Sequence, residues 1–163
     1  MKDNNIQKLA EITKLLLFSG ITNLSKTKWN KLLFFIDSAY YNSPFGNKKR
    51  TLTECEYIKM PYGPMINNFH IILSFLQDDF NIKISNYIGY STGSMTFIEG
   101  SNDTSLELEI ISTKESEIVN KVASIFGKYT AAQLRQNGAP SGLENRGFDA
   151  SIYHKTRKPT EGT

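Results

Sequence analysis

The segment from about Ser25 to Tyr41 constrains the fold more than any other part of the chain. Its apolar side chains recur at the i, i+3, i+4, i+7 spacing of a buried helix face. They are Trp29, Leu32, Leu33, Ile36 and Tyr40. Phe34 and Phe35 widen this face further around the helix, beyond what one neighbouring helix covers. The sequence therefore predicts a central helix that packs against neighbours on more than one side.

Helical periodicity also predicts further helices on both sides of this one. The expected segments are residues 4–19, 53–58, 64–76, 113–127 and 130–136. Thr53 with Glu56, and Ser112 with Glu115, have the spacing of capping boxes at helix starts. Pro64 suits the first position of a helix. Gly63 lies between an aromatic residue and this proline, so we expect a backbone conformation there that a Cβ would strain.

Between about residues 82 and 110 the apolar pattern alternates at every second position. The runs are Ile82 with Ile84, Met95 with Phe97, and Leu106 and Leu108 with Ile110. Turn sequences at 91–94 and 100–103 separate them, which is typical of an antiparallel meander. The expected fold class is α+β and mostly helical: a bundle of about five helices with a small three-stranded antiparallel β-meander.

The C-terminal end of the chain has a different composition. Residues 138–163 hold four Gly and two Pro and only scattered apolar residues, too few to offset the entropy of ordering the backbone. We predict one domain over residues 1–136. Residues 137–163 are expected to form a tail that is flexible or orders on a partner.

Cysteine content and hydropathy predict the compartment. Cys55 is the only cysteine, which excludes an intrachain disulfide and any zinc site with two cysteines. A lone thiol fits a reducing environment. No apolar run reaches the roughly 18 residues that a transmembrane helix needs. We expect a cytoplasmic protein that has no membrane partner.

The charge pattern argues against a nucleic-acid partner. The 19 basic and 16 acidic residues give a formal net charge of only +3, and they are largely interspersed along the chain. A dedicated nucleic-acid binder gathers a stronger basic excess on one face. No zinc finger or basic helix is present, and the helix predicted over 25–41 is too apolar to lie in a groove of DNA.

Sequence patterns for catalysis and cofactor binding are lacking. Neither a G-x-x-x-x-G-K-[ST] nor a G-x-G-x-x-G loop occurs, so no phosphate-binding loop of these kinds is expected. Cys55 and His70 could pair as nucleophile and base, but no third residue near them would orient the base. We expect no cofactor, no metal and no enzymatic activity.

Asp37 is the unusual acidic residue because it lies inside the most apolar helix, one turn from Leu33 and Tyr41. An unpaired carboxylate would be costly to bury there. We interpret Asp37 as a structural acid that binds a tyrosine hydroxyl or backbone amides, in preference to a direct role in binding. An enzyme with a site around Asp37, Tyr57 and Tyr62 is the alternative.

Four segments of the first half form a connected pattern. They are Lys31-Leu32-Leu33-Phe34-Phe35-Ile36-Asp37, Tyr40-Tyr41, Leu52-Thr53-Glu54-Cys55-Glu56-Tyr57 and Pro61-Tyr62-Gly63-Pro64. The pattern resembles the SocA-like (Panacea) antitoxin domain, over roughly residues 5 to 135. That family shows a K-L-L-[YF]-[YF]-x-[DQ] helix, a threonine-led segment ending in E-Y and an aromatic-Gly-Pro turn. The family positions carried over, as core or candidate partner-binding residues, are Leu32, Leu33, Phe35, Asp37, Thr53, Glu56, Tyr57, Tyr62, Gly63 and Pro64.

This resemblance implies an antitoxin that binds and neutralises a cognate protein toxin through a protein–protein interface. It leaves open a role as an adaptor that delivers the toxin to a AAA+ protease. Family members commonly continue after the last helix with a Ser/Thr-His pair and then Pro-Trp, whereas this chain has Arg135-Gln136-Asn137-Gly138-Ala139-Pro140. That departure favours the alternative of a phage-associated or regulatory interaction module that lacks a toxin partner.

Overall fold

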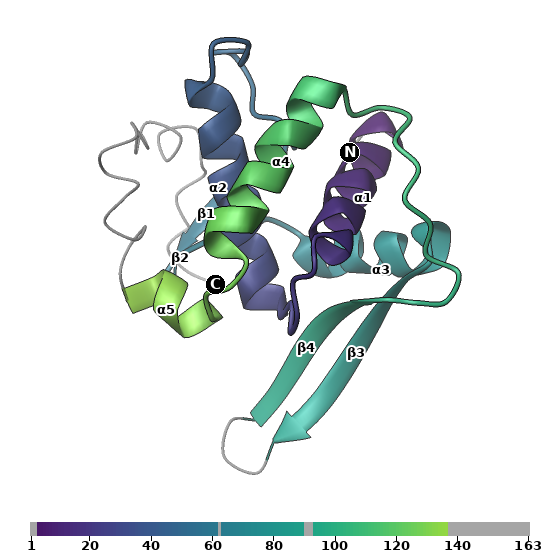
Figure 1. Ribbon diagram of the computed structural model, residues 1–163. Helices are drawn as coiled ribbons and strands as arrows, with labels where there is room; N and C mark the ends of the chain where they lie inside the picture. The colour runs from purple at the N-terminus through teal and green to yellow at the C-terminus, as the bar shows by residue number, and fades with distance from the viewer. Residues whose placement is uncertain (1–2, 62, 90–92, 137–163) are drawn as a thin grey trace.

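The computed structural model describes residues 3–61, 63–89 and 93–136. Along these residues lie five helices and four strands (Figure 1). In chain order they are α1 (Asp3–Phe18), α2 (Lys26–Asn42), β1 (Tyr57–Met60), β2 (Gly63–Ile66), α3 (Phe69–Phe80), β3 (Ile82–Gly89), β4 (Gly93–Gly100), α4 (Thr113–Phe126) and α5 (Ala131–Gln136). The fold class is α+β, as predicted.

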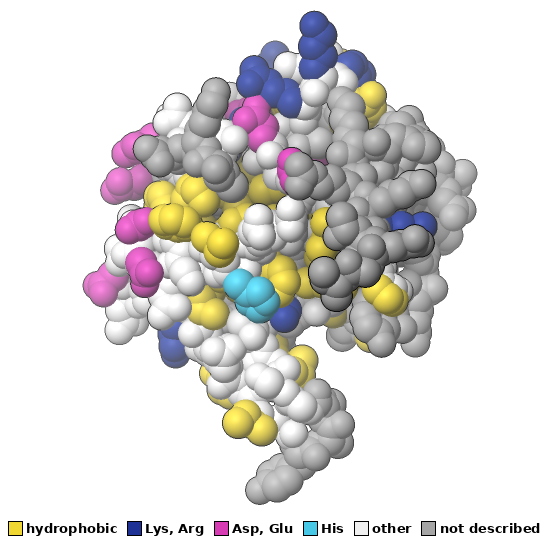
Figure 2. Space-filling model, turned by 180° about the vertical axis from the view of Figure 1, so that it is seen from behind, with side chains coloured by type: hydrophobic (Ala, Val, Ile, Leu, Met, Phe, Trp, Pro, Cys, Tyr) yellow, Lys and Arg dark blue, Asp and Glu magenta, His cyan; other side chains and the backbone are white. Residues whose placement is uncertain are grey.

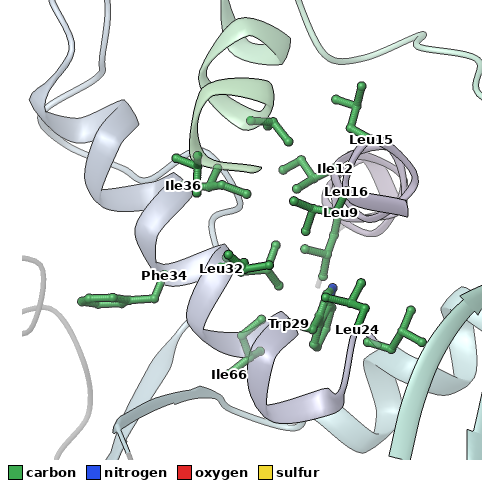
Figure 3. Close-up of a cluster of buried hydrophobic side chains, with 14 of the residues drawn as sticks. Leu9, Ile12, Leu15, Leu16, Leu24, Trp29, Leu32, Phe34, Ile36 and Ile66 are labelled. Atoms are coloured by element: carbon green, nitrogen blue, oxygen red, sulfur yellow. The ribbon is translucent and has the colours of Figure 1, made fainter. Parts of the chain in front are cut away.

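Helix α2 is the central element, as its apolar pattern predicted. Every residue from Lys28 to Ser38 is buried, so the helix is covered around its circumference. Figure 3 shows Leu32 and Ile36 facing the side chains of α1, while Phe34 points to another side. The Trp29 indole donates a hydrogen bond of 3.0 Å to the Thr13 hydroxyl of α1. The elements that pack on the central helix, among them α4 and β2, are therefore positioned by it.

The start of α4 follows the predicted capping box. The Ser112 hydroxyl accepts a hydrogen bond from the Glu115 amide at 3.2 Å, and the Glu115 carboxylate accepts one from the Ser112 amide at 2.8 Å. Each side chain satisfies an amide that the helix leaves without a partner. Because this signal is local, the sequence alone located it correctly.

The predicted helix over 53–58 is wrong, because β1 begins at Tyr57 and pairs antiparallel with β2. The Thr53 hydroxyl accepts from the Cys55 amide and donates to Asp37, so it does not cap a helix at Glu56. Glu54 has a φ of 54°, a left-handed conformation that interrupts a right-handed helix. Thr53 and Glu54 thus make a turn into the strand.

The helix predicted to open at Pro64 begins instead at Phe69. Pro64 lies in β2 opposite Lys59, and the two-stranded hairpin is an edge position that tolerates proline. The side-chain oxygen of Asn30, on α2, accepts a hydrogen bond of 2.8 Å from the Ile66 amide. This contact holds β2 against the central helix. Helix α3 begins only after the strand has ended.

The predicted three-stranded meander is also wrong. Of the three runs expected to form it, two become strands, β3 and β4, which pair as a hairpin that extends away from the helices (Figure 1). On β4, the Ile98 amide donates to the Leu24 carbonyl at 2.8 Å, so the segment before α2 contacts this strand. The third alternating run, Leu106 to Ile110, forms no strand.

A buried carboxylate explains the conformation of that third run. Glu11 of α1 is buried, and its oxygens accept hydrogen bonds from the amides of Glu109, Ile110 and Ile111 at 2.9 to 3.1 Å. These amides are thus bonded to a helix side chain and not to a neighbouring strand. The period of two reflects an extended segment held on α1.

Two predictions fall on parts of the chain for which the structure gives no description. The proposed tail, 137–163, and the family position Tyr62 both lie outside the described residues. Among the helices that are described, none is long and apolar enough to cross a membrane.

Candidate functional site

The Asp37 carboxylate is the centre of a buried hydrogen-bond network between α2 and the segment that leads into β1. Asp37 has 0% of its surface exposed. Its Oδ1 accepts from the Thr53 amide at 2.8 Å, and its Oδ2 accepts from the hydroxyls of Thr53 at 2.5 Å and Tyr57 at 2.6 Å. The interpretation of Asp37 as an acid satisfied by a tyrosine hydroxyl and a backbone amide is confirmed.

Burial dominates the electrostatics of this network. It raises the pKa of Asp37 from 3.8 to about 6, although the hydrogen bonds from Thr53 and Tyr57 act in the opposite direction. Burial, followed by the charge of Asp37, raises the pKa of Tyr57 well above 10. The phenol therefore keeps its proton at neutral pH and is a donor to Asp37.

A carboxylate beside two hydroxyls could serve as a general base if a substrate reached it. Here the side chains of Asp37, Thr53 and Tyr57 are all buried. The ring of Phe34 lies edge-on to Tyr57, with 5.4 Å between centroids. The network consequently holds β1 on the central helix, and in this conformation it offers no atom to a substrate.

The remaining family positions lie around this network. Leu32 and Leu33 are fully buried, and Phe35 packs on Phe126 of α4 with 4.8 Å between ring centroids. Pro64 is buried in β2, whereas Glu56 is exposed. Of the family positions that the structure describes, Glu56 is thus the one whose side chain is on the surface.

Gly63 opens β2 with a φ of 110°, which confirms the conformation expected of it. A Cβ added there would lie 3.2 Å from the Lys31 ammonium of α2. Both the backbone angle and this close approach favour glycine. The β1–β2 turn can therefore approach the Lys31 side chain of the central helix closely because residue 63 is glycine.

The exposed neighbour of the network is a groove of about 680 Å³. Glu54, Cys55 and Glu56 line one side, and α3 lines the other. The apolar lining residues are Ile6, Cys55, Ile66, Ile71, Ile72, Phe75 and Phe80.

Burial, followed by the charge of Asp37, raises the pKa of the Cys55 thiol to about 12, so this thiol is protonated and a poor nucleophile.

Sequence reasoning missed two residues of this groove, Ile71 and Phe75. The sequence predicted a helix over 64–76 and assigned neither of these two side chains to a functional surface. The signal was present, because Ile71 and Phe75 extend the apolar face of the helix beyond Ile72, and a face this wide can make more than one apolar contact. Within the described residues, no group of three or more His, Cys, Asp or Glu is placed to hold a metal ion.

A known protein family matches more than half of the chain. The model of the family described as antitoxin SocA-like, Panacea domain, matches residues 29–137. The chain belongs to this family. No curated protein and no solved structure gives a significant match.

The Panacea domain match begins inside α2, so α1 lies outside it although the sequence resemblance was drawn from residue 5. The Asp37 network, the β1–β2 hairpin and α3 all lie within the matched residues. Membership of this family supports a general role in a toxin–antitoxin system and a protein as the partner.

Proposed function

We propose that this Panacea domain protein is an antitoxin that binds a cognate protein toxin directly and neutralises it through a protein–protein interface. The observation that carries the proposal is the family match over residues 29–137. In this proposal the protein needs no cofactor and catalyses no reaction. The toxin is inactivated by the formation of the complex.

The burial of most family positions supports separate roles for buried and exposed residues: the buried ones stabilise the fold, and the exposed ones contact the partner. Asp37, Thr53 and Tyr57 stabilise the fold from inside, so they contribute to binding only by presenting the surface above them. Interfaces depend on a few large apolar anchors surrounded by polar contacts. Exposed apolar side chains of this kind, such as Ile71 and Phe75, are present on α3.

The same burial argues against the enzymatic alternative around Asp37, Tyr57 and Tyr62. A general base must come within hydrogen-bond reach of its substrate, and Asp37 and Tyr57 would first have to separate from their packing. We therefore retain a non-enzymatic role in the proposal.

The experiment is a test of neutralisation in cells. The reading frame beside this gene is expressed from an inducible promoter, alone and together with the chain. We expect growth arrest when it is expressed alone and restored growth on co-expression. Growth that is normal in both cultures would favour the second candidate, an interaction module without a toxin, which the sequence after Gln136 already suggests.

The role as a protease adaptor is tested in the same cells. If the protein delivers its toxin to a AAA+ protease, co-expression shortens the half-life of the toxin, and rescue fails in a strain that lacks the protease. If it acts by binding alone, the toxin accumulates in an inactive complex and rescue persists.

A further inference from the structure

The groove between α3 and residues 54–56 presents two exposed apolar side chains. Ile71 is 58% exposed and Phe75 is 44% exposed. They lie four residues apart on α3, so both project from the same face. The groove they border, of about 680 Å³, falls within the ~300–1,000 Å³ of clefts that enclose a compact ligand. The surface is therefore concave as well as apolar.

The rim of this groove is acidic. Glu54 and Glu56 line one side and Asp79 the other, with Asp78 beside it. Glu54 pairs with Arg50 at 2.8 Å. Among the described residues, no Lys, Arg or His nitrogen lies within 4.0 Å of the carboxylates of Glu56, Asp78 or Asp79.

This local charge contrasts with the formal net charge of +3 of the whole chain. Figure 2 shows the face that carries α3, where hydrophobic side chains gather beside acidic ones. An acidic rim around an apolar floor attracts a partner of opposite charge and disfavours an acidic one. The rim thus narrows the chemistry of the partner.

We propose that this groove is the toxin-docking surface, and that it takes a segment whose apolar side chains are flanked by Lys or Arg. The inference rests on the proposed antitoxin function and names the surface and the partner chemistry. The partner's apolar side chains cover Ile71 and Phe75 and exclude water from the rim. Its basic side chains then pair with Glu56 and Asp79, in the manner of an amphipathic segment in a groove.

Two exposed positions outside the groove serve as controls. Ile88 is 90% exposed and lies near the end of β3 that points away from the helices (Figure 1). Asp103 is an exposed acid outside the groove. Ile88→Lys replaces an exposed apolar side chain with lysine, as Phe75→Lys does, and Asp103→Lys makes one charge reversal of the kind that the double variant makes twice. Neither substitution touches the proposed site.

The test is the affinity of the purified chain for the purified product of the adjacent reading frame. Phe75→Lys is expected to weaken binding by about 30-fold or more, the effect of losing a central anchor. The double variant Glu56→Lys/Asp79→Lys is expected to weaken it by about tenfold and to remove most of its dependence on salt. Ile88→Lys and Asp103→Lys are expected to stay within about threefold of wild type, and unfolding curves establish that each variant is folded.

A photo-crosslinker placed at position 75 identifies the partner segment. We expect crosslinks to a segment that contains apolar residues and Lys or Arg. Crosslinks to an acidic segment, or groove variants that bind as tightly as wild type, would overturn the docking proposal while leaving the antitoxin function standing. If wild type itself neither binds nor neutralises the toxin, the proposed function fails and the docking proposal fails with it.

Two other occupants would also overturn the proposal. Self-association of the chain that Phe75→Lys abolishes would assign the groove to a second copy. Faster hydrogen exchange at Ile71 and Phe75 after truncation at Gln136 would assign it to the chain's own C-terminal segment.

Discussion

The Asp37 carboxylate accepts a hydrogen bond of 2.6 Å from the Tyr57 hydroxyl, and this contact joins the central helix to the first residue of β1. Thr53 contributes two further donors to the same carboxylate. Two of the four sequence segments that carry the family pattern are therefore connected by one buried acid. Residues 54–56, which lie between Thr53 and Tyr57, line the groove beside α3.

Asp37→Asn should change how stability depends on pH. The pKa of Asp37 is raised to about 6 in the folded state, so the folded protein retains a proton that the unfolded chain loses near pH 4. The contribution of Asp37 to the free energy of unfolding is thus full below about pH 4 and decreases as the pH rises through 6. Between pH 4 and pH 7 the decrease is about 2 kcal/mol.

Urea unfolding of wild type and Asp37→Asn at both pH values provides the measurement. The asparagine does not titrate, so the variant lacks this decrease. From pH 4 to pH 7, the free energy of unfolding of Asp37→Asn should therefore rise relative to that of wild type by about 2 kcal/mol. Comparing the two proteins cancels the opposite effect of Glu115, whose pKa is lowered. Stability curves that run parallel from pH 4 to pH 7 would contradict the raised pKa.

Asp37→Leu should destabilise the fold, because it leaves the Thr53 amide and the hydroxyls of Thr53 and Tyr57 without an acceptor. Each orphaned buried donor costs about 1–3 kcal/mol, so we expect a loss of about 3 kcal/mol or more in the free energy of unfolding. Asp37→Asn is the matched control, and it should retain most partner binding. A catalytic turnover that disappears in Asp37→Asn, with stability intact, would instead support the enzymatic alternative.

Gly63→Val should lower the melting temperature by several degrees. The φ of 110° at this position is unfavourable for a β-branched residue, and a Cβ would approach the Lys31 ammonium; the cost is roughly 1–2 kcal/mol. Gly100→Val is the matched control, because no atom lies within 4 Å of a Cβ added there. Equal melting temperatures for the two variants would show that the β1–β2 turn does not need glycine.

Glu11→Ala should release the segment that precedes α4. The carboxylate of Glu11 binds the amides of residues 109–111, and charge-assisted hydrogen bonds of this kind are the stronger ones. We expect a loss of about 2–4 kcal/mol in the free energy of unfolding and faster hydrogen exchange at these amides. Glu107→Ala, at an exposed position nearby, should change neither quantity.

Local signals predicted the central helix, the capping box of α4 and the buried role of Asp37. The β1–β2 hairpin and the conformation of residues 104–110 were not predictable in this way, because tertiary contacts decide them. Asn30 binds the amide of Ile66, and Glu11 binds the amides that would otherwise extend the sheet. Periodicity describes which side chains face inward, and it does not say which group receives a backbone amide.

The candidate site was predicted in part for the same reason. An acid within an apolar helix pointed to Asp37, and the same argument applied to Glu11, beside Ala10 and Ile12, would have found the second buried carboxylate. The groove was missed because it depends on α3 lying next to residues 54–56, an arrangement fixed by the hairpin. No spacing along the chain carries that information.

The central claim is that the protein neutralises a toxin by binding it directly, and the most direct test is to mix the two purified proteins. Size-exclusion chromatography with light scattering measures the mass of the complex, and a toxin activity assay on the same fractions measures neutralisation. The account predicts that wild-type chain and toxin form a complex of defined stoichiometry in which the toxin is inactive. With Phe75→Lys in place of the wild-type chain, it predicts that toxin elutes free and active. Toxin that elutes alone and fully active in the presence of excess wild-type chain would contradict it.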